Sequence, residues 1–248
     1  MRTVINKYAG IIPTELFTQA VYPHNPYPYF AQRYHVNTTL VGGHGFWGNL
    51  LLMNQEQRMR AGKMVVKSKK VLPFISHLPT EVNGLVGAGP EVYVQLNRTV
   101  AAGQVIAFSG TAGTFPVKVA LAGDSCLGVL NHAYQLSLDS LLLPFQFNRP
   151  EDSREAFVLP NSGCGISIES STGWLDDIIL LREKQQLRIT PGNTGTITIR
   201  VPSYLSIQLN QIIQPIKQAA ENKRFQYYTV HLVDQQPVTI YWHKNVTQ

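Results

Sequence analysis

The stretch that decides the fold class is TVAAGQVIAFSGTAGTFPVKVALAGDSCLGVL, residues 99–130. Its apolar runs are short, and Gly or Pro, the residues that punctuate a chain between secondary-structure elements, separates them. The runs at 105–107, 117–119 and 127–129 have the length and composition of short strands. The stretch therefore predicts a mainly β fold.

Two further apolar runs, at 64–66 and 92–94, extend this pattern toward the N-terminus. Short strands joined by frequent turns are typical of sandwiches and barrels. We therefore expect a β domain over residues 56–133, built as a small β-barrel or sandwich.

The N-terminal segment has a different composition. Between residues 22 and 30 the chain alternates Pro with aromatic residues, and each X-Pro step favours an extended backbone at the preceding residue. This pattern predicts an extended N-terminal arm over residues 1–55, whose aromatic side chains dock on another surface because they have no core of their own. The aromatic residues predicted to bind a partner are Tyr22, Tyr27, Tyr29 and Phe30.

Two pairs of strand-like segments lie in the C-terminal part. Residues 187–190 and 196–201 alternate apolar with polar side chains on either side of a Gly-rich turn, which predicts a hairpin with one wet face. Residues 225–233 and 238–243 form the second candidate hairpin. The chain is therefore expected to end in β structure.

One helix is predicted between these pairs. Apolar residues recur at helical spacing from 203 to 223, and Pro215 would kink or split this helix. We therefore expect a β-rich C-terminal domain over residues 134–248 that contains one helix.

The composition excludes several protein classes. Of 248 residues, 44% are hydrophobic and 15% are charged, so disorder is not expected for most of the chain. No apolar run approaches the roughly 20 residues of a membrane helix, and the N-terminus lacks the apolar centre of a signal peptide. We expect no membrane association and a protein made in a cytoplasm.

The net charge is +6, and much of the excess lies between residues 58 and 70. The basic residues there are Arg58, Arg60, Lys63, Lys67, Lys69 and Lys70. Nucleic-acid binders usually add aromatic stacking residues or a known module, and neither is present. An acidic protein partner or a solvated face is therefore preferred over direct nucleic-acid binding, and Arg58, Arg60, Lys67 and Lys69 are predicted to bind the partner.

No catalytic pattern is recognisable in the sequence. It contains no nucleophile elbow, no phosphate-binding loop and no pair of His residues at metal-ligand spacing. Cys126 and Cys164 are expected to be small buried thiols, and the pair at 176–177 is expected to lie in a turn. We expect no enzyme, no cofactor and no metal.

Residues 99–108, followed by 117–120, 122–124 and 127–130, resemble the capsid decoration, or cement, proteins of tailed bacteriophages. The resemblance extends over roughly residues 61–133. It implies a structural virion protein that sits outside an icosahedral shell, assembled in the host cytoplasm, at junctions between major capsid subunits. The implied partner is the major capsid protein, and a homo-oligomer is expected, with a trimer favoured.

Two alternatives stay open. One is a carbohydrate-binding or glycan-hydrolysing β protein for host recognition, with Tyr22, Tyr27, Tyr29, Trp47, Trp174 and Trp242 available as sugar platforms. Hydrolysis needs two carboxylates about 5 to 10 Å apart, and the sequence offers no clear candidate pair. The other alternative is a structural protein of a phage tail or baseplate.

Overall fold

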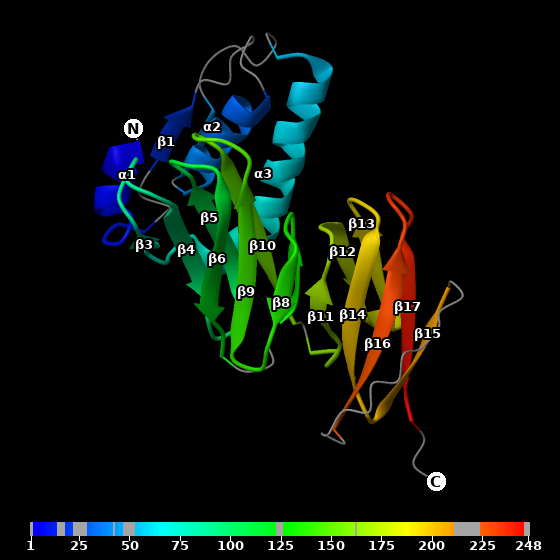
Figure 1. Cartoon of the computed structure of the whole chain (residues 1–248). Helices are drawn as coiled ribbons and strands as arrows, with labels where there is room; N and C mark the ends of the chain where they lie inside the picture. The colour runs from blue at the N-terminus through cyan, green and yellow to red at the C-terminus, as the bar shows by residue number, and fades with distance from the viewer. Residues whose placement is uncertain are drawn as a thin grey trace. The chain divides into compact units, whose positions relative to one another are not determined.

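The computed structural model describes residues 2–13, 18–21, 29–41, 43–46, 53–122, 126–161, 163–210 and 224–245. The chain forms two compact units (Figure 1). Unit 1 comprises Met1–Arg98, Ala102–Val117 and Pro144–Phe157, and unit 2 comprises Thr99–Ala101, Lys118–Leu143 and Val158–Gln248. The chain thus passes between the units several times, a path that differs from the predicted order of three consecutive segments.

The centre of unit 1 is a sheet in which β3–β4 and β4–β5 pair antiparallel. Its strands are β3 (Glu81–Asn83), β4 (Glu91–Asn97), β5 (Ala102–Phe108) and β10 (Ser153–Pro160), in the order β3-β4-β5-β10, and β7 (Cys126–Leu130) follows β10. Every residue of β5 is buried, because the sheet is covered on both faces there. The short apolar run at 105–107 is therefore a central strand, as predicted.

Helix α3 (Gln55–Ile75) packs against β4 and β5. A capping box starts it: the Asn54 side chain accepts from the Gln57 amide while the Gln57 side chain accepts from the Asn54 amide. Residues 64–66 lie inside this helix, so the strand predicted there is wrong. Buried residues recur along α3 at spacings of three and four, which is the helical period.

The predicted extended arm is not confirmed. The described part of it contains α1 (Arg2–Tyr8), β1 (Thr18–Val21), α2 (Tyr29–Val41) and β2 (Gly43–Phe46), with β1 and β2 paired in parallel. An extended backbone at 29–41 is wrong, because the prolines end at Pro28 and no residue of the helix is a proline. Val36 and Leu40 of α2 are buried, so this helix belongs to the body of unit 1.

Unit 2 contains most of two further sheets, and β6 and β9 continue from it into unit 1. The larger has the order β16-β14-β11-β8-β9-β6, and the smaller has the order β12-β13-β17-β15. The strands of the larger sheet are β6 (Gly113–Ala120), β8 (Tyr134–Leu136), β9 (Ser140–Phe147), β11 (Ser167–Ser171), β14 (Gly195–Pro202) and β16 (Phe225–Leu232). Those of the smaller sheet are β12 (Leu175–Leu181), β13 (Gln186–Pro191), β15 (Leu205–Leu209) and β17 (Val238–Lys244).

The fold is mainly β, as predicted, and its body is sandwich-like. Each sheet has two ends in its strand order, so the predicted barrel alternative is wrong. Ile189 and Ile240 from the smaller sheet and Ile197 and Val230 from the larger sheet are buried. They form the apolar core of unit 2.

Both predicted hairpins are wrong in their pairing, although their strands are correct. β13 pairs with β12 and β17, whereas β14 pairs with β11 and β16 (Figure 1). In each predicted hairpin, therefore, the two successive strands belong to different sheets. Alternation along a strand indicates one buried face but does not say whether the next strand lies beside it or across the core.

The predicted helix at 203–223 is also corrected where the structure describes it. Residues Leu205–Leu209 form strand β15, which pairs with β17. Residues 211–223 lie outside the described residues. Leu205, Ile207 and Leu209 alternate with polar residues, so the shorter β period applies here rather than the helical one.

Candidate interaction surface

The inner side of α3 is fixed to the sheet by buried amide side chains. Gln95 and Gln104 face each other in the β4–β5 register. Gln95 Nε2 donates to the carbonyl of Ile75 (2.9 Å), the last residue of α3, and to that of Leu78 (3.0 Å) just beyond the helix. Because the last carbonyls of a helix have no partner within it, these bonds stabilise the helix end and its position together.

Gln104 extends the same network toward α2. Its Nε2 donates to the Leu40 carbonyl (2.7 Å) and to Gln95 Oε1 (3.1 Å), and its Oε1 accepts from Ser68 Oγ of α3 (3.3 Å). All three side chains are buried. Two strands thus hold two helices at defined positions, and the outward side of α3 is presented on a rigid support.

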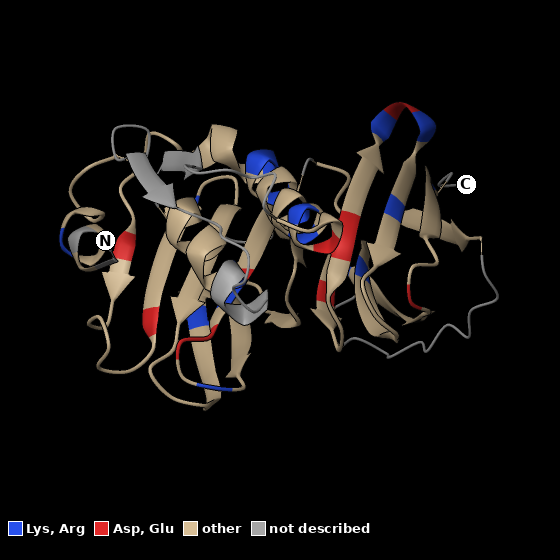
Figure 2. Cartoon of the chain, turned by 90° about the horizontal axis from the view of Figure 1, so that it is seen from above, with Lys and Arg blue, Asp and Glu red and all other residues tan. Residues whose placement is uncertain are grey.

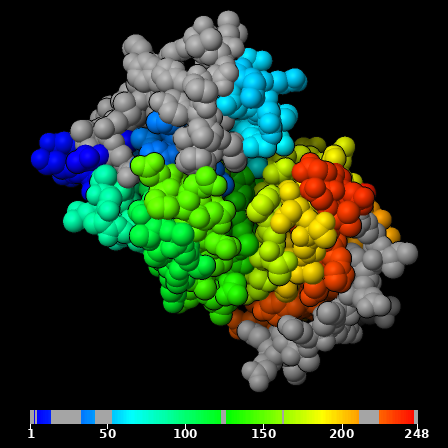
Figure 3. All heavy atoms as spheres, turned by 45° about the horizontal axis from the view of Figure 1, so that its top comes forward, coloured from blue at the N-terminus to red at the C-terminus, as the bar shows by residue number. Residues whose placement is uncertain are grey.

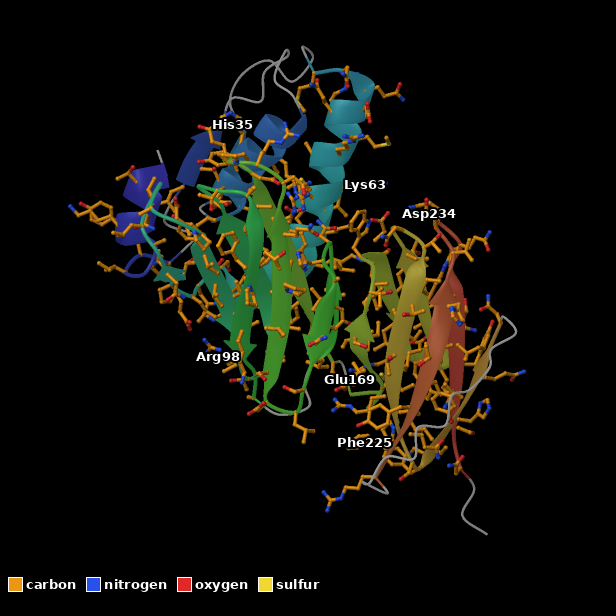
Figure 4. All side chains as sticks on the ribbon, viewed as in Figure 1. His35, Lys63, Arg98, Glu169, Phe225 and Asp234 are labelled. Atoms are coloured by element: carbon orange, nitrogen blue, oxygen red, sulfur yellow. The ribbon has the colours of Figure 1, made fainter. Side chains whose placement is uncertain are left out.

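The outward side of α3 combines aliphatic and basic side chains. Met59 and Val66 are 54% and 58% exposed. At 100° per residue they lie on one side of the helix, flanked by Arg58, Lys63 and Lys69, which are also exposed. We call these five residues the α3 outer face. Figure 2 shows the concentration of basic residues along α3, Figure 3 shows α3 in cyan at the surface, and Figure 4 labels Lys63 on it.

The charged residues of α3 are predominantly basic. It carries six basic residues and one acidic residue, Glu56. Glu56 forms an ion pair with Arg60, one helical turn away. Exposed pairs of this kind contribute little to stability, but this one leaves the outer face dominated by positive charge.

The structure distributes the predicted basic residues over different sides of α3. Arg58 and Lys69 lie on the outer face, and Arg60 is partly exposed in its pair with Glu56. Lys67 is only 8% exposed and lies on the inward side, so we leave it out of the interaction surface. In an extended chain Lys63, Lys67 and Lys69 would share a face. On the helix, Lys69 lies about 120° around the axis from Lys63, and Lys67 is buried whereas Lys63 and Lys69 are exposed.

The predicted aromatic residues are described only in part. Tyr22 and Tyr27 lie outside the described residues. Tyr29 and Phe30 form the first turn of α2, and their side chains are not described. Their role in binding a partner stays a prediction.

A second buried polar network joins α2 to β10, and the sequence does not predict it. Arg33 Nε and Nη2 donate to the Glu155 carboxylate at 2.8 and 3.0 Å. Asn37 Nδ2 donates to Glu155 Oε2 (2.8 Å) and to Ser153 Oγ (3.0 Å). More than 110 positions separate the partners in sequence, so no local motif could have shown it. The network positions α2 on the sheet.

The two cysteines lie in unit 2 and are poor nucleophiles. Burial raises the pKa of the Cys126 thiol to about 12 and also raises the pKa of Cys164. Because the thiolate is the reactive form, both side chains are protonated near neutral pH. This geometry gives neither cysteine the electropositive, accessible surroundings of a catalytic thiol.

The acidic pair at 176–177 lies in a strand and not in a turn. Asp176 and Asp177 lie in strand β12, so the predicted turn is wrong there; a bulge between Leu175 and Asp177 occupies this place. Within the described ranges, no three His, Cys, Asp or Glu side chains come together as a possible metal site. None of the described helices combines the length and apolar character needed to cross a membrane.

Comparisons with known proteins assign no family to this chain: no family model matches it, and no curated protein matches it.

Proposed function

We propose that this chain is a non-catalytic structural protein that binds the outside of a phage capsid, at junctions between major capsid subunits, through the α3 outer face. The observation that carries the proposal is a helix held rigidly on a sheet with exposed Met59 and Val66 between basic residues. An acidic protein surface with small apolar contacts complements this arrangement in both charge and chemistry.

The composition of the face favours a protein partner over nucleic acid. Met and Arg are enriched in protein interfaces, where aliphatic groups are buried and charges lie at the rim. Phosphate backbones instead select cations and polar donors, and single strands add aromatic stacking. Met59 and Val66 gain nothing from a phosphate backbone, and the α3 outer face includes no aromatic residue.

The choice of a capsid rests on the resemblance of residues 99–130. Strands β5, β6 and β7 lie in this stretch. The same face could serve a tail or baseplate protein, and the experiment therefore includes tails as a second target.

The test is titration of labelled protein onto empty particles assembled from a major capsid protein of the same genome. Lys63→Glu combined with Lys69→Glu is expected to weaken binding roughly tenfold or more, because both changes oppose an acidic partner. The control is Lys118→Glu with Lys184→Glu, which changes the net charge equally at two exposed lysines outside α3. It is expected to bind nearly as the wild type does.

The affinity of the wild type is also expected to fall as salt rises from about 50 to 500 mM, because exposed charges are screened beyond a few ångströms at the higher value. Equal binding by both double variants would contradict the α3 outer face as the contact. Binding to purified tails without binding to shells would contradict the capsid as the binding target and support the tail alternative.

A further inference from the structure

Unit 2 carries a second surface with a different chemistry, centred on Trp174. This residue is 48% exposed and precedes β12. The β13–β14 loop and the β16–β17 turn contribute its neighbours. We define the Trp174 site as Trp174, Asp176, Asn193, Asp234 and Gln235; Figure 4 labels Asp234 at the β16–β17 turn.

The indole of Trp174 is held in place although it is exposed. A Cβ built on Gly192 would lie 2.2 Å from indole Cδ1 and 2.4 Å from Nε1, so the ring rests directly on the backbone of the β13–β14 loop. The Trp174 amide donates to Asn193 Oδ1 (3.0 Å), and the Gly192 amide donates to the Trp174 carbonyl (3.0 Å). An exposed aromatic ring that is already fixed loses little entropy when a ligand covers it.

One carboxylate lies beside the ring, and a glutamine side chain connects it to a second carboxylate. Asp176 Oδ1 is 2.9 Å from the same hypothetical Cβ on Gly192. Gln235 Nε2 donates to Asp176 Oδ2 (3.2 Å) and to Asp234 Oδ1 (3.4 Å). The Gln235 backbone has a positive φ of 56° and its amide donates to the Pro191 carbonyl (3.3 Å). The turn is therefore arranged so that one amide side chain orients two carboxylates.

These features select a ligand rich in hydrogen-bond donors that has an apolar face. An ionised carboxylate only accepts hydrogen bonds, so the ligand has to donate. A pyranose does both: its C–H face covers an indole, and its hydroxyls donate to the carboxylates. Ligand sites typically pair an aromatic surface with a few polar groups that fix orientation in this way.

Other ligand classes fit less well. A proline-rich segment also packs on aromatic rings, but Pro has no N–H, so its carbonyls would face acceptors at Asp176 and Asp234. Anionic ligands would be repelled by the same two carboxylates.

We propose that the Trp174 site binds a glycan, with the indole as its platform and Asp176 and Asp234 as acceptors for its hydroxyls. The binding involves no bond cleavage. Of the other two tryptophans, Trp242 is only 7% exposed and Trp47 lies outside the described residues. The site is independent of the α3 outer face, so either proposal can fail without the other.

The test uses the full chain and three soluble probes: cellohexaose, maltohexaose and chitohexaose. Binding is followed by saturation-transfer NMR and by tryptophan fluorescence. At least one probe is expected to bind, and Trp174→Ala is expected to weaken that binding tenfold or more. Trp174→Phe, which keeps a flat ring, is expected to lose less. Tyr204→Ala is the matched control, because Tyr204 is an exposed aromatic residue of unit 2 outside the site.

Asp234→Asn removes an acceptor and adds a donor on an exposed turn, and it is expected to weaken binding about threefold or more while the circular dichroism spectrum stays unchanged. The proposal is overturned if no probe binds, or if Trp174→Ala binds as tightly as Tyr204→Ala. Selective binding of a proline-rich or lysine-rich decapeptide in place of all three glycans would overturn it as well.

Discussion

The two candidate surfaces of this chain differ in the sign of their charge and in the kind of apolar group they expose. The α3 outer face of unit 1 places cations around aliphatic side chains on a long helix. The Trp174 site of unit 2 places carboxylates around an aromatic ring on loops. The net charge of the whole chain, +6, combines the charges of a basic surface and an acidic one. The contrast shows that the net charge describes neither binding chemistry.

The units also differ in how they are held together. In unit 1, helices are attached to the sheet by buried polar networks at Gln95, Gln104 and Glu155. Where the structure describes it, unit 2 has an apolar sandwich core in which Arg200 is buried. Unit 1 therefore depends more on specific hydrogen bonds, which are directional, and unit 2 depends more on apolar burial, which is not.

The largest expected effect tests the polar network of unit 1. Glu155→Ala leaves Arg33 and Asn37 without their buried partner, and breaking a buried ion pair from one side typically costs about 3–5 kcal/mol. We expect a loss of this size in the free energy of unfolding, measured by urea denaturation. Glu81→Ala is the control, since its pair with Arg98 is exposed and is expected to contribute below about 1 kcal/mol.

A smaller loss at Glu155 than at Glu81 would contradict the assigned importance of the network. It would also mean that this network does not determine the position of α2 on the sheet.

The next effect concerns unit 2. Arg200 is buried, donates from Nε to Ser167 Oγ (3.1 Å), and lies over the Phe225 ring at 5.1 Å. Arg200→Ala removes these contacts, and we expect a loss of about 2–4 kcal/mol in the free energy of unfolding. Arg188→Ala on an exposed position of β13 is expected to be nearly neutral. Equal stabilities of the two variants would show that unit 2 gains nothing from its buried cation.

The smallest effect is a dependence on pH. Burial raises the pKa of Cys126 from 9.0 to about 12, so the unfolded thiol ionises before the folded one. The stabilisation by the protonated thiol is complete below pH 9 and is lost as the pH rises toward 12. At pH 10 the loss is about 1 kcal/mol.

Urea denaturation at pH 8 and pH 10 measures this loss. We expect Cys126→Ala to lose less stability between the two pH values than the wild type does. An equal loss in both proteins would mean that Cys126 does not titrate differently on unfolding.

The sequence predicts strands well where apolar runs are short and separated by Gly or Pro, as at β5, β6 and β7. Sequence-based prediction fails where the spacing of apolar residues fits both a helix and a strand. Residues 64–66, predicted as a strand, lie in α3, and Leu205–Leu209, predicted as helix, form β15. The sequence cannot predict pairing across a sandwich, because β13 and β14 have the same alternation whether they are paired or in opposite sheets.

The candidate surfaces were predictable to different degrees. The basic cluster is visible in the sequence, but the sequence does not show that Lys67 is buried while Lys63 and Lys69 are exposed. For the Trp174 site, the sequence shows the tryptophan as one of several possible platforms. Its neighbours Asn193 and Gln235 come from distant loops, so the arrangement depends on tertiary structure alone.

Lysine reactivity on the particle tests whether the α3 outer face is the contact. The bound and unbound protein are treated with an amine-reactive label, and the modified lysines are quantified by mass spectrometry. If the α3 outer face is the contact, Lys63 and Lys69 lose reactivity on binding, while Lys118 and Lys184, which are exposed outside α3, keep theirs. Unchanged reactivity of Lys63 and Lys69 on saturated particles, with protection at Lys118 or Lys184 instead, would contradict the account.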